Sequence, residues 1–157
     1  MDIVNLWING CKILINKDNP HTFRRRVVPI MACNDGFTMS VQASPAHYCE
    51  PKCDDGTMDY LDYDDTHIIH RKFEIGFPNM QEDLLMEYAE DEEHPCGTVY
   101  ARVPLETILK VIDKHKGLNL KVMSKGKVQH GGTLGFDYKS DEDLLKRFKE
   151  LIFIEVI

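Results

Sequence analysis

The chain has 157 residues, of which 43% are hydrophobic and 29% are charged, and its formal net charge at pH 7 is −7. This length predicts one domain with a real core that needs neither metal nor disulfides, and the composition excludes a disordered chain, a collagen-like repeat and a coiled-coil rod. The negative balance argues against a broadly basic nucleic-acid binder, and no apolar run approaches the roughly 18–20 residues of a membrane span.

The negative charge is concentrated in the middle of the chain. Residues 50–94 contain fifteen Asp and Glu against three Lys and Arg, whereas the regions on either side are slightly basic. The five cysteines are an odd number, and the first residues lack the basic region of a secretory signal. These features predict free thiols in a reducing cytoplasm.

The first half of the chain reads mainly as strands. Residues 3–15 are apolar with mixed spacing, which fits either a short helix or a strand. Residues 27–32 predict a strand at a sheet edge or with a bulge, because Pro29 has no N–H for a ladder. Residues 37–43 alternate strictly between apolar and polar, and the Asn34-Asp35-Gly36 turn before them predicts a β-hairpin.

An irregular acidic loop is expected from residue 44 to residue 66, followed by a strand within residues 67–77. Asn79 and Glu82 have the spacing of a capping box and predict a helix. The expected buried residues of this helix are Met80, Leu84, Leu85 and Tyr88. Residues 97–103 alternate again and predict another strand.

Residues 105–116 carry the clearest helical pattern, which ends in Lys114, His115 and Lys116 before Gly117. Its predicted apolar face, at the spacing i, i+3, i+4 and i+7, consists of Leu105, Ile108, Leu109 and Ile112. Farther on, the sequence suggests a hairpin over residues 118–130, a flexible glycine-rich loop at 131–136, a helix beginning at Ser140 and a final strand at 152–157.

Together these elements predict one α+β domain spanning residues 1–157. We expect a mainly antiparallel sheet covered by about three helices, with an acidic loop inserted at about residues 50–66.

A cysteine-rich stretch offers two kinds of chemistry. His47, Cys49 and Cys53 carry ligand types that suit Zn²⁺, and a fourth ligand could come from Cys33, Cys96, His67 or His70. Alternatively, Cys49 could act as a nucleophile with His47 as its base, although the neighbouring Glu50 opposes a thiolate. The cysteine spacing of three residues, without a second cysteine pair, favours unreactive thiols and no cofactor.

The acidic residues allow three interpretations. They could bind Ca²⁺ or Mg²⁺, but the spacing does not fit an EF-hand. They could replace a nucleic-acid backbone and bind a basic groove of a protein partner. They could also form a solvated loop. The candidate partner-binding residues are Asp54, Asp55, Asp59, Asp62, Asp64, Asp65, Glu90, Asp91, Glu92 and Glu93.

A different class of function is a small enzyme or small-ligand-binding protein. Its pocket would lie near the predicted hairpin and gather polar groups on one side of it. The residues of this alternative pocket are Ser40, Gln42, His47, Tyr48 and Cys49.

Four stretches, in this order, resemble segments of a known protein family: residues 32–44 (ACNDGFTMSVQAS), 48–52 (YCEPK), 74–78 (EIGFP) and 99–104 (VYARVP). In this combination the chain resembles a family of small, mostly uncharacterised proteins of tailed bacteriophages and prophages. It departs from them by Glu-Pro-Lys after Cys49, where Ser-Pro-Arg is expected, and by a longer acidic insertion from Cys53 to Thr66. Because the family has no established activity, the resemblance implies no catalytic residues.

What the resemblance implies is a phage accessory protein in the host cytoplasm. Combined with the acidic residues in the middle of the chain, it suggests a non-enzymatic inhibitor, with an anti-defence (anti-CRISPR) protein as the candidate type. The expected partner is a host or defence protein, or a nucleoprotein complex, with a basic surface. We expect no direct nucleic-acid binding and no membrane association, and the sequence leaves the oligomeric state open.

Overall fold

A computed structural model describes residues 2–11, 13–15, 25–44, 47–51 and 68–123 of the chain. Several predictions fall outside these described residues. They concern the six aspartates between Asp54 and Asp65, Cys53, the glycine-rich loop at 131–136, and the helix and strand expected after Ser140.

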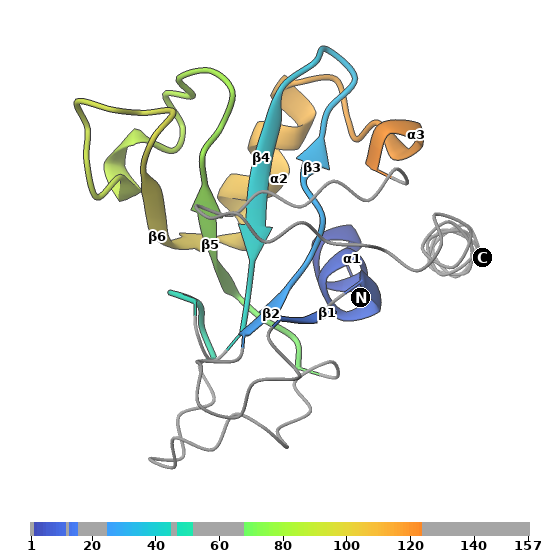
Figure 1. The fold of residues 1–157 in the computed structure, drawn as a ribbon. Coiled ribbons are helices and arrows are strands. Elements are labelled where there is room, and N and C mark those ends of the chain that lie inside the picture. The colour runs from blue at the N-terminus through green and yellow to red at the C-terminus, as the bar shows by residue number, and fades with distance from the viewer. Residues whose placement is uncertain (1, 12, 16–24, 45–46, 52–67, 124–157) are drawn as a thin grey trace.

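Two antiparallel sheets and three helices form the described structure (Figure 1). The larger sheet has the strand order β3-β4-β5-β6 and the smaller pairs β1 with β2. The strands are β1 (Ile13–Ile15), β2 (Arg25–Val27), β3 (Met31–Ala32), β4 (Thr38–Gln42), β5 (Lys72–Gly76) and β6 (Val99–Pro104). The α-helices are α1 (Ile3–Cys11), α2 (Leu105–Lys114) and α3 (Leu120–Met123), and η1 (Met86–Tyr88) is one 3₁₀ turn.

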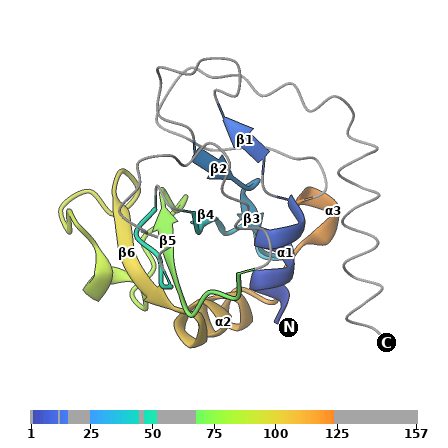
Figure 2. The ribbon, with the colours of Figure 1, turned by 90° about the horizontal axis from the view of Figure 1, so that it is seen from below.

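The antiparallel sheets and the helices beside them confirm the predicted α+β class. Figure 2 shows α2 on one side of the four-stranded sheet and the β1–β2 ribbon on the other. Residues 3–15, whose state the sequence left open, divide into α1 and β1. Within the described ranges, no helix has the length and apolar character needed to cross a bilayer.

The predicted hairpin is confirmed at the turn Asn34-Asp35-Gly36. Met31 pairs with Met39 and Ala32 with Thr38, so β3 and β4 are adjacent and antiparallel. Gly36 has φ +95°, a conformation that glycine adopts without steric cost. The interruption at Pro29 separates β2 from β3, and β3 lies at the edge of the larger sheet.

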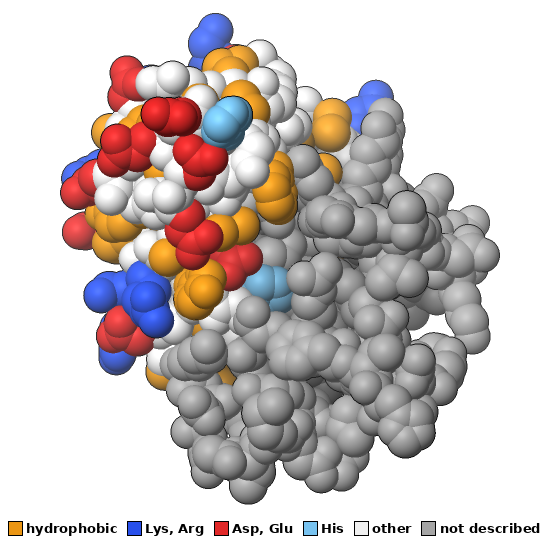
Figure 3. All heavy atoms as spheres, turned by 60° about the vertical axis from the view of Figure 1, so that its left-hand side comes forward, with side chains coloured by type: hydrophobic (Ala, Val, Ile, Leu, Met, Phe, Trp, Pro, Cys, Tyr) orange, Lys and Arg blue, Asp and Glu red, His pale blue; other side chains and the backbone are white. Residues whose placement is uncertain are grey.

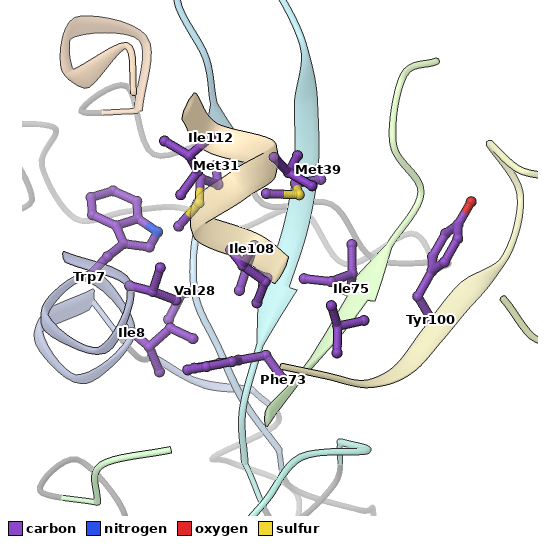
Figure 4. Packing of buried hydrophobic residues seen from close by; sticks show 14 of the residues in the cluster. Trp7, Ile8, Val28, Met31, Met39, Phe73, Ile75, Tyr100, Ile108 and Ile112 are labelled. Atoms are coloured by element: carbon purple, nitrogen blue, oxygen red, sulfur yellow. The ribbon is translucent and has the colours of Figure 1, made fainter. Parts of the chain in front are cut away.

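The core lies between α1, α2 and one face of the sheet (Figure 4). The apolar side chains that alternate along the hairpin strand are buried there, together with Phe73 and Ile75 of β5, and the polar Ser40 and Gln42 of the same strand are buried as well. From α2 the buried residues are Ile108, Val111 and Ile112. Leu109, which we predicted on this face, is 39% exposed, and Val111 is buried instead.

The helix predicted at residues 79–88 is wrong. The Asn79 side chain does not cap a helix but bonds the β3–β4 turn, accepting from the amide of Thr38 at 2.9 Å and donating to the carbonyl of Gly36 at 2.8 Å. Such side-chain-to-backbone bonds compete with helix formation. Only η1 is helical here, and Met80 and Leu84 are exposed. Likewise, residues 120–123 form α3 rather than a strand.

Candidate functional site

The connection from β5 to β6 is the most strongly charged described surface. Between Lys72 and Arg102 the sequence has no Lys or Arg. It has eight acids there: Glu74, Glu82, Asp83, Glu87, Glu90, Asp91, Glu92 and Glu93. We call residues 82–93 the acidic segment. Its predicted partner-binding residues, 90–93, are all exposed, and Figure 3 shows acidic side chains gathered on the face that contains this connection.

Asp91 differs from its neighbours because its carboxylate organises the turn. It accepts a hydrogen bond from the amide of Glu93 at 3.0 Å and contacts His94 Nδ1 at 2.8 Å. The bond with His94, followed by the amide of Glu93, lowers the pKa of Asp91 below its usual value. Asp91 therefore shapes the turn, and Glu90, Glu92 and Glu93 are the better candidates for contact with a partner.

Apolar side chains accompany these carboxylates. Met80 is 44% exposed and Leu84 is 37% exposed, next to Asp83 in the chain. Protein interfaces combine apolar anchors with a polar rim, so this mixture suits a protein partner better than a simple ion.

A charge cluster, buried at Glu82 and His115, fastens the start of the acidic segment to the end of α2. The Glu82 carboxylate, 1% exposed, contacts Lys114 Nζ at 2.7 Å and His115 Nε2 at 2.6 Å. The other ring nitrogen, Nδ1, contacts Asp35 Oδ2 at 2.7 Å. The imidazole ring stacks on Phe37 with 4.0 Å between centroids. We call Asp35, Glu82, Lys114 and His115 the His115 clamp.

Both ring nitrogens face a carboxylate, an arrangement that suits a protonated ring, because only an imidazolium donates from both nitrogens. Burial acts to lower the pKa of His115, but the bonds to Asp35 and Glu82 outweigh it and raise the pKa above its ordinary value. Burial likewise acts to raise the pKa of Glu82, but Lys114, the amide of Leu84 and His115 together lower it. Both shifts favour the ion pair.

Sequence reasoning missed this cluster. It placed Glu82 in a capping box and His115 at a helix end, and neither position signals a partner 33 residues away. The sequence predicts the Asp-Gly turn. It does not predict that the Asp35 carboxylate faces His115, because that contact depends on how α2 packs against the hairpin.

The five residues of the alternative pocket are distributed over three places. Gln42 donates to Ser40 Oγ at 2.9 Å and exchanges hydrogen bonds with the backbone of Val28, which fastens β4 to the preceding segment. Ser44 Oγ lies 2.5 Å from His47 Nδ1, and Cys49 Sγ donates to the Ser44 carbonyl at 3.4 Å. These side chains are buried.

Tyr48 is the fifth of these residues and lies at the surface, 43% exposed, with the Arg102 guanidinium 5.6 Å from its ring centroid. This pair therefore belongs to the outer face of β6.

The metal ligands considered from the sequence are only partly described. His47 and Cys49 are buried, and Cys53 lies outside the described residues. In the part of the chain that the structure describes, no group of three or more His, Cys, Asp or Glu is placed to hold a metal ion. Burial, reinforced by Asp35, raises the pKa of Cys33 to about 11, which opposes the thiolate that a zinc ligand requires.

Comparison of this chain with protein-family models, curated proteins and solved structures gives no match. The resemblance to phage accessory proteins stays a prediction from the sequence.

Proposed function

We propose that this protein acts by binding, and that its acidic segment contacts a basic surface on a protein partner. The observation that supports the proposal is the stretch between Lys72 and Arg102, where residues 73–101 include eight acids and no Lys or Arg. Glu82 is neutralised by the clamp, but Glu90, Glu92 and Glu93 face solvent.

The energetics of such a surface favour a charged partner. Carboxylates held close together repel one another, and a basic surface relieves that repulsion while it accelerates association. The His115 clamp holds the start of the acidic segment in place, and the bonds of Asp91 shape its end. A surface that is already ordered loses less conformational entropy on binding.

The phage resemblance adds a setting to this proposal. In the host cytoplasm, carboxylates that take the place of nucleic-acid phosphates would occupy the basic groove of a host or defence protein or nucleoprotein complex. A non-enzymatic inhibitor of that kind needs a well-placed acidic surface and no catalytic set.

The test begins with affinity capture from bacterial lysate and continues with association rates for the captured protein. The variant Glu92→Gln/Glu93→Gln removes two outward charges and leaves Asp91 in its turn. Its association rate at low salt should fall about threefold to tenfold, because electrostatic steering weakens with each charge removed. The rate should also depend less steeply on ionic strength than that of the unmodified protein.

A matched control removes the same charge from α2. Glu106→Gln/Asp113→Asn alters two exposed carboxylates outside the acidic segment and should leave the rate within about twofold. If both double variants slow association equally, the effect comes from net charge alone. If neither slows it, the acidic segment is not the binding surface.

A further inference from the structure

The paired strands β5 and β6 separate positive from negative charge along their length. Lys72 pairs with Pro104 at one end of the ladder and Gly76 with Val99 at the other. The acidic segment extends from the Gly76 end, whereas Arg71 and Lys72 lie at the other end, and Arg102 lies in β6 between the residues that pair with Phe73 and Ile75. We call Arg71, Lys72 and Arg102 the basic patch. At about 3.3 Å per residue, the two ends of β5 are about 13 Å apart.

Among the described residues, the three cations of the basic patch lie beside two acids, Glu50 and Glu74, and the Glu74 carboxylate accepts from the Tyr48 amide at 2.9 Å. Glu50 contacts Arg71 at 3.2 Å and Lys72 at 3.3 Å, so one carboxylate is shared by two cations. The Arg71 side chain nevertheless remains 71% exposed. Arg102 contributes a third cation, stacked on Tyr48.

A bulge in β6 directs Arg102 outward. Phe73 pairs with Val103 but Ile75 pairs with Tyr100, so Ala101 and Arg102 together oppose one residue of β5. Arg102 has φ +50°, an uncommon conformation for a residue with a side chain, and its amide donates to the Tyr48 carbonyl at 3.1 Å. The fold thus accepts local strain at the residue that completes the basic patch.

We propose that this face binds a second copy of the chain in a two-fold symmetric pair. A two-fold axis lying in the interface, perpendicular to the β5–β6 direction, places the acidic segment of each copy against the basic patch of the other. Figure 3 shows acidic side chains over the upper and middle part of one face and, at its lower left, a group of Lys and Arg with an acidic side chain beside it. Such a face is complementary to itself.

Exposed apolar side chains accompany both charged regions. Tyr48 lies at the basic patch, and Met80 and Leu84 lie beside the acidic segment. In the symmetric pair they supply the apolar contact that charge alone does not. The outer edge of β6 already has backbone partners within the chain, because the Glu90 amide donates to the Val99 carbonyl and the Arg102 amide donates to the Tyr48 carbonyl. The symmetric pair therefore does not involve pairing of β6 strands between the two copies.

This inference goes beyond the proposed function and is tested on the purified full chain alone. Sedimentation velocity at about 10 mM and about 1 M salt changes the screening length from about 30 Å to about 3 Å. We expect dimers at low salt that dissociate at high salt. The variants Arg71→Glu/Arg102→Glu and Glu92→Lys/Glu93→Lys should each associate at least tenfold more weakly than the unmodified chain.

Mixing the two variants gives the decisive result. The first variant makes the basic patch negative and the second places two cations at the end of the acidic segment, so an equimolar mixture should form a heterodimer at low salt. Lys110→Glu/Lys121→Glu changes the net charge as Arg71→Glu/Arg102→Glu does, but on α2 and α3, and should still dimerise.

Two outcomes would overturn the proposal. The first is that the unmodified chain and the mixture of the two variants are both monomeric at low salt. The basic patch would then be a site for an anionic partner of another kind. The other is a dimer that neither salt nor either double variant weakens, because its interface would lie elsewhere. Both outcomes leave the basic-partner proposal standing on its own test.

Discussion

Replacing Ile108 by alanine is expected to lower the free energy of unfolding by about 2–5 kcal/mol. The side chain is fully buried and points from α2 into the cluster that includes Met39, Phe73 and Ile75 (Figure 4). Truncation removes apolar contacts from both layers and leaves a cavity that the sheet cannot close. Chemical denaturation followed by circular dichroism measures the change.

The adjacent residue provides a matched control. Leu109→Ala removes a side chain of similar size from the same helix, but Leu109 is 39% exposed, so we expect a cost below about 1 kcal/mol. Equal costs at the two positions would mean that α2 faces the sheet with a different side from the one described.

The elements that the sequence predicted correctly depend on local signals. The Asp-Gly turn requires a residue that accepts positive φ, and the strict alternation after it fixes which side of β4 faces the core. The pattern in residues 105–116 likewise identifies α2, although Val111 is buried there and the predicted Leu109 is not. In these places, neighbouring residues and the final packing favour the same structure.

The wrong helix at residues 79–88 shows where local signals fail. Asn79 and Glu82 have the spacing of a capping box, but each finds a stronger partner elsewhere in the fold. Asn79 bonds the hairpin turn and Glu82 bonds the end of α2. These contacts span 32 to 43 positions, so only the assembled sheet brings them together. The same contacts leave Met80 and Leu84 at the surface, beside the acidic segment.

The second large effect is expected at His115. In His115→Leu the cation between Asp35 and Glu82 disappears, and Glu82 keeps a buried carboxylate with Lys114 as its remaining side-chain partner in the clamp. Breaking a buried ion pair from one side costs about 3–5 kcal/mol. Adding Glu82→Gln to His115→Leu should restore part of the loss, because the uncompensated charge is removed. Strict additivity of the two substitutions would contradict a coupled clamp.

The pH dependence of stability provides an independent measurement. The pKa of His115 is raised on folding. Its contribution to the free energy of unfolding is therefore fully present below the unfolded-state pKa of about 6.5 and is lost as pH rises through the folded-state pKa. The lowered pKa of Glu82 means that its contribution is present above its ordinary value of 4.5 and is lost as pH falls through the folded value. The clamp is therefore complete between about pH 5 and pH 6.5.

We expect the melting temperature of the unmodified chain to decline above that window more steeply than that of His115→Leu, so the gap between the two narrows with rising pH. The His115 ring resonance, followed by NMR over the same range, should titrate at the pH where the gap narrows. Two melting curves that stay parallel from pH 5.5 to pH 9 would show that the ring carries no proton that stabilises the fold, and a neutral ring could donate to only one of the two carboxylates.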